Sequence, residues 1–346
     1  MVESWCLTMR IAVVGLGFMG STHLQAYKHV PGAEIVAVVS DDPTKLTGDL
    51  SAIKGNLDRP SEAVDFSKFR KYATIAEVMA DKDVEAVDLC LPTYLHETAA
   101  LAALKEGKHV LVEKPMALDG AACDRMIAAA QEAGKVLMCA QVLRFWADYQ
   151  PVVQAQRSQS LGPVRSALFR RRCAAPAWGQ WLKDPEKGGG GVFDLLIHDV
   201  DMAIHLFGLP ESVSATGHED LSHGVDVIVG QMHYANVPTV AITGGWHHPS
   251  AYPFSMEYTV AFDRGTIEFS TAGRPVTLYT HDGREEAMEK PEKDGFAAEL
   301  AYFVECATKN KQPEICPPAE SAAAVKITRL LVEARKQNGE KVPCRL

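Results

Sequence analysis

The chain has 346 residues, of which 47% are hydrophobic and 23% charged. This length exceeds one typical domain and is enough for a sizeable core, so we expect two domains. The 35 basic and 44 acidic residues give a formal net charge of −9, and the longest basic run is 170–172. That balance argues against nucleic acid as a partner. No apolar stretch approaches the length needed to cross a membrane.

The cysteines are scattered and show neither Cys-x-x-Cys pairs nor the His/Cys spacing of a zinc site. Such a distribution is typical of reduced thiols, several of them in the core, and predicts a cytoplasmic protein without a metal centre. The eight positions are Cys6, Cys90, Cys123, Cys139, Cys173, Cys306, Cys316 and Cys344.

From residue 10 onward, short apolar segments alternate with segments of helical pattern. Strands are expected at 11–14, 34–40, 84–91, 109–112 and 136–141, with helices such as 97–106 and 119–133 between them. Alternation on this scale predicts βαβ units, a parallel sheet and right-handed crossovers. The polar segment 47–68 is longer than a compact unit needs, and we interpret it as an insertion.

After about residue 144 the pattern changes to strands joined by turns, which predicts a large and mostly antiparallel open sheet. The expected strands are 164–172, 212–218, 225–234, 238–246, 256–263, 266–270 and 275–280, with helices near 192–207, 296–309 and 319–337. The fold class is therefore α/β, with a dinucleotide-binding domain over 9–143 and an α+β domain over 144–346. The closing helices could pack back on the first domain.

The first expected strand runs directly into the glycine-rich turn Gly15-Leu-Gly17-Phe-Met-Gly20 and then a helix. In a Rossmann domain the first glycine permits the tight turn, the second lets a pyrophosphate approach, and the third lets helix and strand pack closely. The free N–H groups and positive dipole end of the helix face the phosphates. This placement predicts a dinucleotide site.

Asp41 closes the second expected strand, 21 positions after Gly20, where a carboxylate can accept hydrogen bonds from the adenosine ribose. Asp42 follows and no arginine adjoins the pair, so a ribose phosphate would meet two carboxylates. We therefore favour NAD over NADP. The alternative interpretation is a simple capping turn formed by Asp41, Asp42 and Pro43.

A third motif, Glu113-Lys114-Pro115, ends the expected strand 109–112. The carboxyl ends of strands in an open α/β sheet are where ligands bind. A lysine at that position is a candidate proton donor or acceptor. The alternative is a charged turn exposed to solvent.

The helix that follows the glycine run 188–191 places Asp194, His198, Asp201 and His205 on one arc beside a broad apolar face. Asp194 and His198 lie close to the glycines, where a ligand can approach the backbone. A histidine with a carboxylate partner suits general-base work. We expect Asp201 and His205 to be structural, and a solvated face remains the alternative for either pair.

The order and separation of four motifs resemble the Gfo/Idh/MocA oxidoreductase family. The motifs are the glycine fingerprint, Leu91-Pro92-Thr93 with His96, Glu113-Lys114-Pro115 and Asp194-x-x-x-His198. The resemblance covers nearly all of residues 9–338. It implies a Rossmann domain that holds NAD(H) or NADP(H), a second domain whose open sheet forms a homodimer or homotetramer, and a substrate between them. It also implies that Lys114, Asp194 and His198 are catalytic and that the Lys-Pro bond is cis. The expected cofactor contacts are Gly15, Gly17, Phe18, Met19, Gly20, Asp41, Leu91, Pro92, Thr93, His96, Glu113, Lys114 and Arg144.

The implied reaction is hydride transfer between a secondary alcohol of a sugar, inositol or related polyol and the nicotinamide. His198 takes the hydroxyl proton, and Lys114 hydrogen-bonds the same oxygen. The expected substrate contacts are Lys114, Arg172, Trp178, Asp194, His198 and His247. Two alternatives stay open: a redox-neutral NAD-dependent enzyme that cleaves glycosidic bonds, and a dinucleotide-binding sensor without catalysis.

Overall fold

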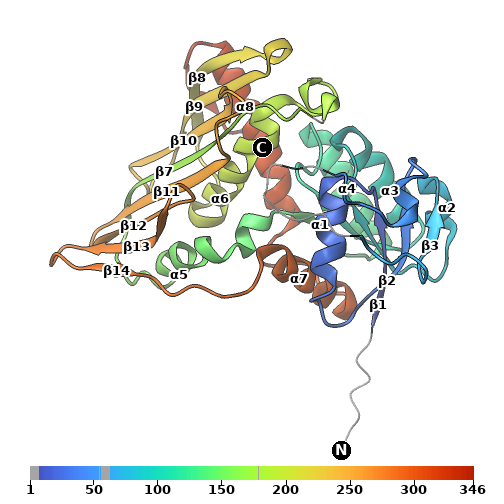
Figure 1. The fold of residues 1–346 in the computed structure, drawn as a ribbon. Helices are drawn as coiled ribbons and strands as arrows, with labels where there is room; N and C mark the ends of the chain where they lie inside the picture. The colour runs from blue at the N-terminus through green and yellow to red at the C-terminus, as the bar shows by residue number, and fades with distance from the viewer. Residues whose placement is uncertain (1–7, 54, 56–62, 178) are drawn as a thin grey trace, which may run out of the picture. The chain divides into compact units, whose positions relative to one another are not determined.

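A computed structural model describes residues 8–53, 55, 63–177 and 179–346. The chain forms two compact units (Figure 1). Unit 1 combines the residues up to Ala117 with Ala121–Val142 and Lys293–Ala319, and unit 2 consists of Leu118–Gly120, Leu143–Glu292 and Glu320–Leu346. Unit 1 is therefore assembled from segments that lie far apart in the sequence.

Unit 1 contains a six-stranded parallel sheet in the order β3-β2-β1-β4-β5-β6. The strands are β1 (Met9–Val14), β2 (Ala33–Val39), β3 (Arg70–Tyr72), β4 (Ala86–Leu89), β5 (His109–Glu113) and β6 (Leu137–Ala140). The helices are α1 (Phe18–Tyr27), α2 (Ile75–Ala80), α3 (His96–Lys105), α4 (Gly120–Ala133) and, from late in the chain, α7 (Gly295–Lys309).

The strands of this sheet are buried on both faces, as expected for a parallel sheet covered by helices. Every residue of β4, β5 and β6 is buried. Strand order reverses between β1 and β4, and ligands of such sheets bind at the carboxyl ends of the strands near this point. The predicted parallel Rossmann architecture is confirmed.

Unit 2 contains a nine-stranded sheet in the order β14-β13-β12-β11-β7-β10-β9-β8-β15. All pairs are antiparallel except β7 with β10. The strands are β7 (Val164–Cys173), β8 (Ser212–Asp220), β9 (Val225–His233), β10 (Thr239–Trp246), β11 (Ser255–Phe262), β12 (Gly265–Ser270), β13 (Arg274–Thr280), β14 (Glu285–Ala287) and β15 (Val342–Pro343). The helices are α5 (Gln150–Ser158), α6 (Ile197–Phe207) and α8 (Pro318–Lys336), of which the last two lie on one face of the sheet (Figure 1).

Strand residues of unit 2 alternate between the helix-covered face and the open face. In β7, Ala167, Phe169 and Arg171 are buried while Leu168 is 42% exposed, and in β9 Val229 is 58% exposed. This period of two is the pattern of a sheet with one covered face. The predicted antiparallel sheet is confirmed, with one parallel pair that the sequence analysis did not include.

Other differences from the predicted elements are small. The sequence analysis missed the short strands β3, β14 and β15 and the helices α2 and α5. Residues 54 and 56–62 of the expected insertion at 47–68 lie outside the described residues, and 45–47 form a turn of 3-10 helix. None of the helices in the described ranges is long and apolar enough to cross a membrane. The seven cysteines among these residues are all free thiols.

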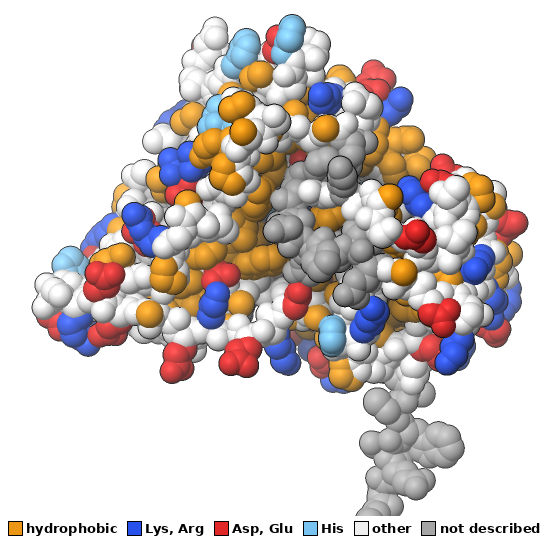
Figure 2. Space-filling model, viewed as in Figure 1, with side chains coloured by type: hydrophobic (Ala, Val, Ile, Leu, Met, Phe, Trp, Pro, Cys, Tyr) orange, Lys and Arg blue, Asp and Glu red, His pale blue; other side chains and the backbone are white. Residues whose placement is uncertain are grey.

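Acidic and basic side chains are interspersed on the face shown in Figure 2. Their arrangement agrees with the modest negative charge of the sequence. The visible face gives no sign of the basic stripe that proteins use to follow a phosphate backbone.

Candidate active site

The glycine-rich turn of unit 1 has the geometry that a pyrophosphate needs. Gly15 has φ +97°, and a Cβ there would lie 2.5 Å from the carbonyl oxygen of Cys90. A Cβ on Gly20 would lie 1.9 Å from the carbonyl oxygen of Gly15, so helix and turn touch at this point. Gly17 precedes α1 without a side-chain cap, and a Cβ there would meet nothing within 4 Å. The first N–H groups of α1 thus have no side-chain cap, and the open space at Gly17 lets a phosphate group approach them.

The two acidic residues after β2, Asp41 and Asp42, have different surroundings. The Asp42 carboxylate accepts hydrogen bonds from the main-chain N–H and the hydroxyl of Thr44, at 2.9 and 2.6 Å. Capping of this turn is therefore done by Asp42, whereas Asp41 is exposed. The capping alternative applies to Asp42, and the assignment of Asp41 to a ribose stays a prediction.

The segment after β4 carries Leu91, Pro92 and Thr93 and leads into α3. The His96 ring is 1% exposed, with Nδ1 2.9 Å from the carbonyl oxygen of Pro115 and Nε2 2.8 Å from that of Leu91. Burial lowers the pKa of His96. Because both ring nitrogens face main-chain oxygens, this buried side chain holds two loops together, which disagrees with the expected contact between His96 and the cofactor.

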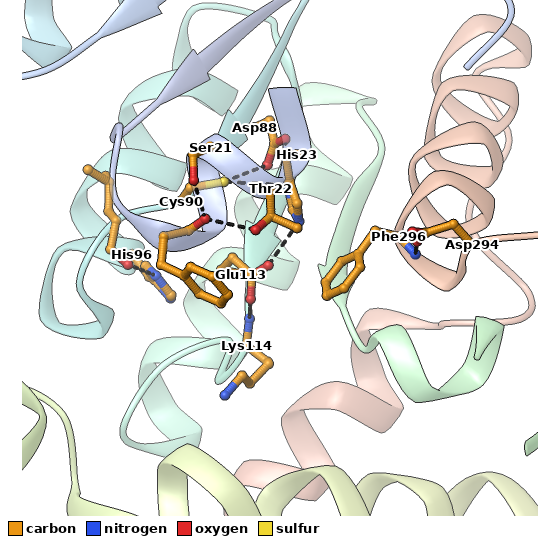
Figure 3. Close-up of polar contacts among 12 residues, drawn as sticks. Ser21, Thr22, His23, Asp88, Cys90, His96, Glu113, Lys114, Asp294 and Phe296 are labelled. Atoms are coloured by element: carbon orange, nitrogen blue, oxygen red, sulfur yellow. Dashed lines mark hydrogen bonds and ion pairs between the residues drawn. The ribbon is translucent and has the colours of Figure 1, made fainter. Parts of the chain in front are cut away.

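Glu113 and Lys114 lie at the carboxyl end of β5, beside β4. Glu113 is only 5% exposed, and its Oε2 accepts the main-chain N–H of Lys114 at 3.0 Å. The Lys114–Pro115 bond is cis, as the family resemblance implies. A solvated turn is therefore the wrong interpretation for Glu113. The half-buried Lys114 side chain extends away from the helix α1 that lies above it in Figure 3.

In unit 2, the glycine run precedes a turn that is held by buried charges. Gly190 has φ +81°, and a Cβ there would lie 2.5 Å from Oδ2 of Asp226. The same oxygen accepts the main-chain N–H of Val192 at 2.9 Å, while Oδ1 pairs with Nη1 of Arg335 at 2.5 Å. Neither Asp226 nor Arg335 was among the predicted site residues, because their partners lie far away in the sequence.

Residues Val192–Leu196 form a π turn, and the regular helix α6 begins only at Ile197. The predicted α-helical spacing of Asp194 and His198 is therefore wrong for the first turn, in which each residue bonds to i+5. Both side chains are half-buried. Asp194 Oδ2 accepts a hydrogen bond from the indole nitrogen of Trp246 at 3.3 Å. The turn and a core tryptophan thus fix the Asp194 carboxylate together.

The second Asp/His pair is structural, as predicted, but the two residues use other partners. Asp201 is 1% exposed and makes a bidentate pair with Arg144 at 2.7 and 2.8 Å. Arg144 also pairs with Glu320 at 2.5 Å, and its side chain has no exposed surface. The expected contact between Arg144 and the cofactor is therefore wrong: this guanidinium neutralises a buried carboxylate. Burial, with Arg144 and Arg157 nearby, lowers the pKa of His205 to about 3.

The basic run on β7 alternates between the two faces of the sheet. Arg171 is buried and makes a bidentate pair with Asp199 of α6 at 3.0 and 3.1 Å. Arg172 lies on the other face, where its Nη2 is 2.6 Å from Glu257. Two guanidinium groups, Arg144 and Arg171, therefore hold two carboxylates of α6 that lie two residues apart.

Aromatic groups gather after β10, where substrate contacts were expected. The rings of His247 and His248 lie 4.0 Å apart, and His248 stacks on Tyr252 at 3.8 Å. The Arg172 guanidinium carbon lies 5.5 Å from the centre of the Tyr252 ring. His247 is exposed. Trp178 lies outside the described residues. A role in substrate contact stays a prediction for Arg172 and His247.

Known proteins resemble this chain along most of its length. An uncharacterized oxidoreductase of Rhizobium meliloti is 30% identical over 224 residues, which are 62% of this chain and 62% of that protein. The scyllo-inositol 2-dehydrogenase (NADP(+)) of Bacillus subtilis is 27% identical over 96% of this chain and 97% of its own length. The structure of levoglucosan dehydrogenase with NADH and levoglucosan superposes with a TM-score of 0.82 at 17% identity, covering 98% of this chain and all of the other.

Family models account for both halves of the chain. Residues 9–141 match the NAD-binding Rossmann fold of an oxidoreductase family, and residues 149–268 match the C-terminal domain of the same family. The first match contains the glycine turn and Lys114, and the second contains Asp194 and His198. The chain belongs to the GFO/IDH/MocA oxidoreductase family.

Proposed function

We propose that this oxidoreductase uses NAD to oxidise a secondary alcohol of a sugar, inositol or related polyol, and that it catalyses the reverse reduction with NADH. The observation that carries the proposal is the open space at Gly17, after β1, together with Lys114, after β5, at the same carboxyl edge of one sheet. Ligands of doubly wound sheets bind at that edge. The relatives named for inositol and levoglucosan support an alcohol of a polyol as the reacting group.

The residues of unit 1 fit the dinucleotide, which supplies a hydride acceptor or donor when it is bound. The pyrophosphate is assigned to the N–H groups that follow Gly17, with Phe18 and Met19 in the same turn. Asp41 is assigned to the adenosine ribose. An exposed carboxylate at that position repels a ribose phosphate, which favours NAD. One relative is named for NADP and one neighbour was solved with NADH, so cofactor choice is a point for experiment.

We assign the acid–base work to Lys114, Asp194 and His198. In the oxidation, His198 accepts the hydroxyl proton as the carbon–hydrogen bond breaks with its electron pair leaving as hydride, and a carbonyl group forms. Lys114 donates a hydrogen bond to the same oxygen and stabilises its developing negative charge. Asp194, held by Trp246, orients His198 or binds a neighbouring hydroxyl. In the reduction the proton returns to the new hydroxyl.

The test is a panel of sugars, inositols and sugar acids with NAD and with NADP, followed by the absorbance of the reduced nicotinamide. On the best substrate, Lys114→Met and His198→Ala should each lower kcat by about 100-fold or more, while NADH binding stays intact. Normal turnover of Lys114→Met would overturn the mechanism, and a clear NADP preference would overturn the role of Asp41. Retained cofactor with no net NADH formation would support redox-neutral glycoside cleavage instead.

We also propose that the open face of the unit 2 sheet forms a homodimer or homotetramer. This face presents Leu168 and Val229, which are 42% and 58% exposed, from strands two places apart in the sheet. Apolar side chains on an uncovered sheet face favour burial against another protein surface. Light scattering after gel filtration tests this proposal: Leu168→Asp with Val229→Asp should shift an oligomer to monomer, and an unchanged mass would refute it.

We further propose a cytoplasmic location, because the described cysteines are all free thiols.

A further inference from the structure

A buried charged cluster lies directly behind the Glu113–Lys114 strand end (Figure 3). His23 on the inner side of α1 has no exposed surface, and its Nδ1 lies 2.8 Å from Oδ2 of Asp88 in β4. Its Nε2 lies 3.1 Å from Oε1 of Glu113 in β5, as an ion pair whose angle is poor for a hydrogen bond. One imidazole ring thus bridges the carboxylates of two adjacent strands.

The carboxylates on either side of the ring favour its protonated form. Burial by itself would lower the pKa of His23, but Asp88 and the neighbouring Cys90 raise it well above its usual value. Cys90 remains a thiol, because burial raises its pKa, and its Sγ lies 3.4 Å from Oδ1 of Asp88. His23, Asp88 and Cys90 also lie close enough to surround a metal ion. A protonated ring and a thiol are donors to Asp88, however, and neither is a metal ligand in that state.

The cluster continues to the main chain of Lys114. Glu113 uses Oε1 for His23 and Oε2 to accept the N–H of Lys114 at 3.0 Å. On the other side of the same turn, the carbonyl oxygen of Pro115 lies 2.9 Å from Nδ1 of His96. Two histidines from α1 and α3 therefore hold the Glu-Lys-Pro turn from both ends.

We propose that His23 and His96 are positioning residues for Lys114: His23 acts through Glu113, and His96 acts through the carbonyl group of Pro115. This inference rests on the proposed role of Lys114. Hydrogen-bonding to a reacting oxygen depends steeply on geometry, so a small displacement of the lysine main chain lowers the rate without removing the lysine. The two histidines touch neither substrate nor cofactor in this assignment.

The test compares three buried histidines of unit 1. His23→Gln removes the bridging charge, and His96→Gln removes the ring that faces two loops. His109→Gln is the matched control, because His109 begins β5 at the end opposite Glu113 and its Nδ1 accepts the main-chain N–H of Val136 at 3.1 Å. Active sites are counted by NADH titration, and kcat per site and both KM values are measured for each variant.

We expect kcat per NADH site to fall at least about tenfold in His23→Gln and His96→Gln, with the KM for NAD within about twofold of wild type. His109→Gln should lower stability and keep kcat per site. If all three variants keep kcat per site, the histidines are merely structural and the proposal is wrong. If His23→Gln fails to fold, His96→Gln decides alone.

Lys114→Met separates this proposal from the proposed function. An inactive Lys114→Met with normal kcat per site in both histidine variants would refute positioning and leave the function intact. An active Lys114→Met would refute the role of the lysine itself, and the positioning role with it.

Discussion

The two units fix their proposed catalytic side chains in different ways. In unit 1, an imidazole ring lies between the carboxylates of Asp88 and Glu113 behind Lys114. In unit 2, the guanidinium of Arg335 pairs with Asp226, which in turn accepts the N–H of Val192 at the start of the turn that carries Asp194. An imidazole titrates near neutral pH, and a guanidinium keeps its charge at any pH that proteins tolerate. The positive charge that supports the Asp194 turn in unit 2 is therefore permanent. The positive charge of His23 behind Lys114 in unit 1 can be lost by deprotonation.

The largest effect should come from removing the permanent charge of unit 2. Arg335→Met leaves the buried Asp226 without its guanidinium partner, and loss of one member of a buried pair costs about 3–5 kcal/mol. Urea unfolding followed by tryptophan fluorescence measures this, since Trp146, Trp181 and Trp246 all belong to unit 2.

The matched control is Arg284→Met, the same substitution at an exposed arginine whose partners, Asp282 and Glu286, are also exposed. It should leave the unfolding curve unchanged. Equal curves for Arg335→Met and Arg284→Met would contradict the importance of the buried pair.

The glycines of the two units should respond oppositely to alanine. Gly190→Ala places a Cβ against Asp226 at a positive φ, which should destabilise the protein by about 1–3 kcal/mol. Gly17→Ala meets no protein atom and should fold normally, but it should bind NADH at least about tenfold more weakly, because its methyl group occupies space assigned to the pyrophosphate. Thermal unfolding and NADH titration of both variants check the contrast. A Gly17→Ala variant with normal NADH affinity would place the phosphates elsewhere.

The smallest effect should be the contribution of His23 to the dependence of stability on pH. Its folded-state pKa lies above the unfolded value, so its contribution is complete below about pH 6.5 and is lost as pH rises through the folded pKa. The groups that face it are Asp88, Glu113 and Cys90, and Tyr27 lies close enough to both Asp88 and Glu299 to interact with their charges. Burial raises the pKa values of Cys90 and Tyr27, which therefore stay protonated as His23 titrates.

Calorimetry of wild type and His23→Gln between pH 6 and 10 measures this contribution as the difference between the two curves. The difference should be greatest at pH 6 and should shrink as the pH rises. His205→Gln is the control from unit 2, because the pKa of His205, about 3, keeps that ring neutral throughout the range. A constant difference for His23→Gln would show that its ring does not titrate there.

Much of the fold follows from local patterns that the sequence displays. The mostly apolar segments 109–112 and 136–141 predict buried parallel strands, and the ends of β5 and β6 lie within one residue of those bounds. β3 is the three-residue segment Arg-Lys-Tyr, whose polar side chains give no strand signal. It exists because its backbone pairs with β2.

Candidate site residues could be predicted where they belong to a sequence motif. They could not be predicted where the site depends on contacts between residues that lie far apart in the sequence. The glycine turn, Lys114 and the Asp194/His198 region are visible as motifs. The π turn is not, and its hydrogen bonds to Asp226 and Trp246 come from other strands. Arg144 looked available for a ligand, since its partner Asp201 lies 57 residues away. His23 was only a polar residue in the first helix, because its partners are 65 and 90 positions distant.

The packing of α7 on α1 has a consequence for how the chain is made. α7 belongs to unit 1 and contributes Phe296, whose ring centre lies 6.1 Å from that of His23, yet all of unit 2 up to Glu292 precedes it in the sequence. A chain emerging from the ribosome therefore presents the six strands of unit 1 long before the helix that completes this unit. Until residues 293–319 appear, the inner side of α1 lacks its cover, so the nucleotide-binding unit finishes folding only near the end of synthesis.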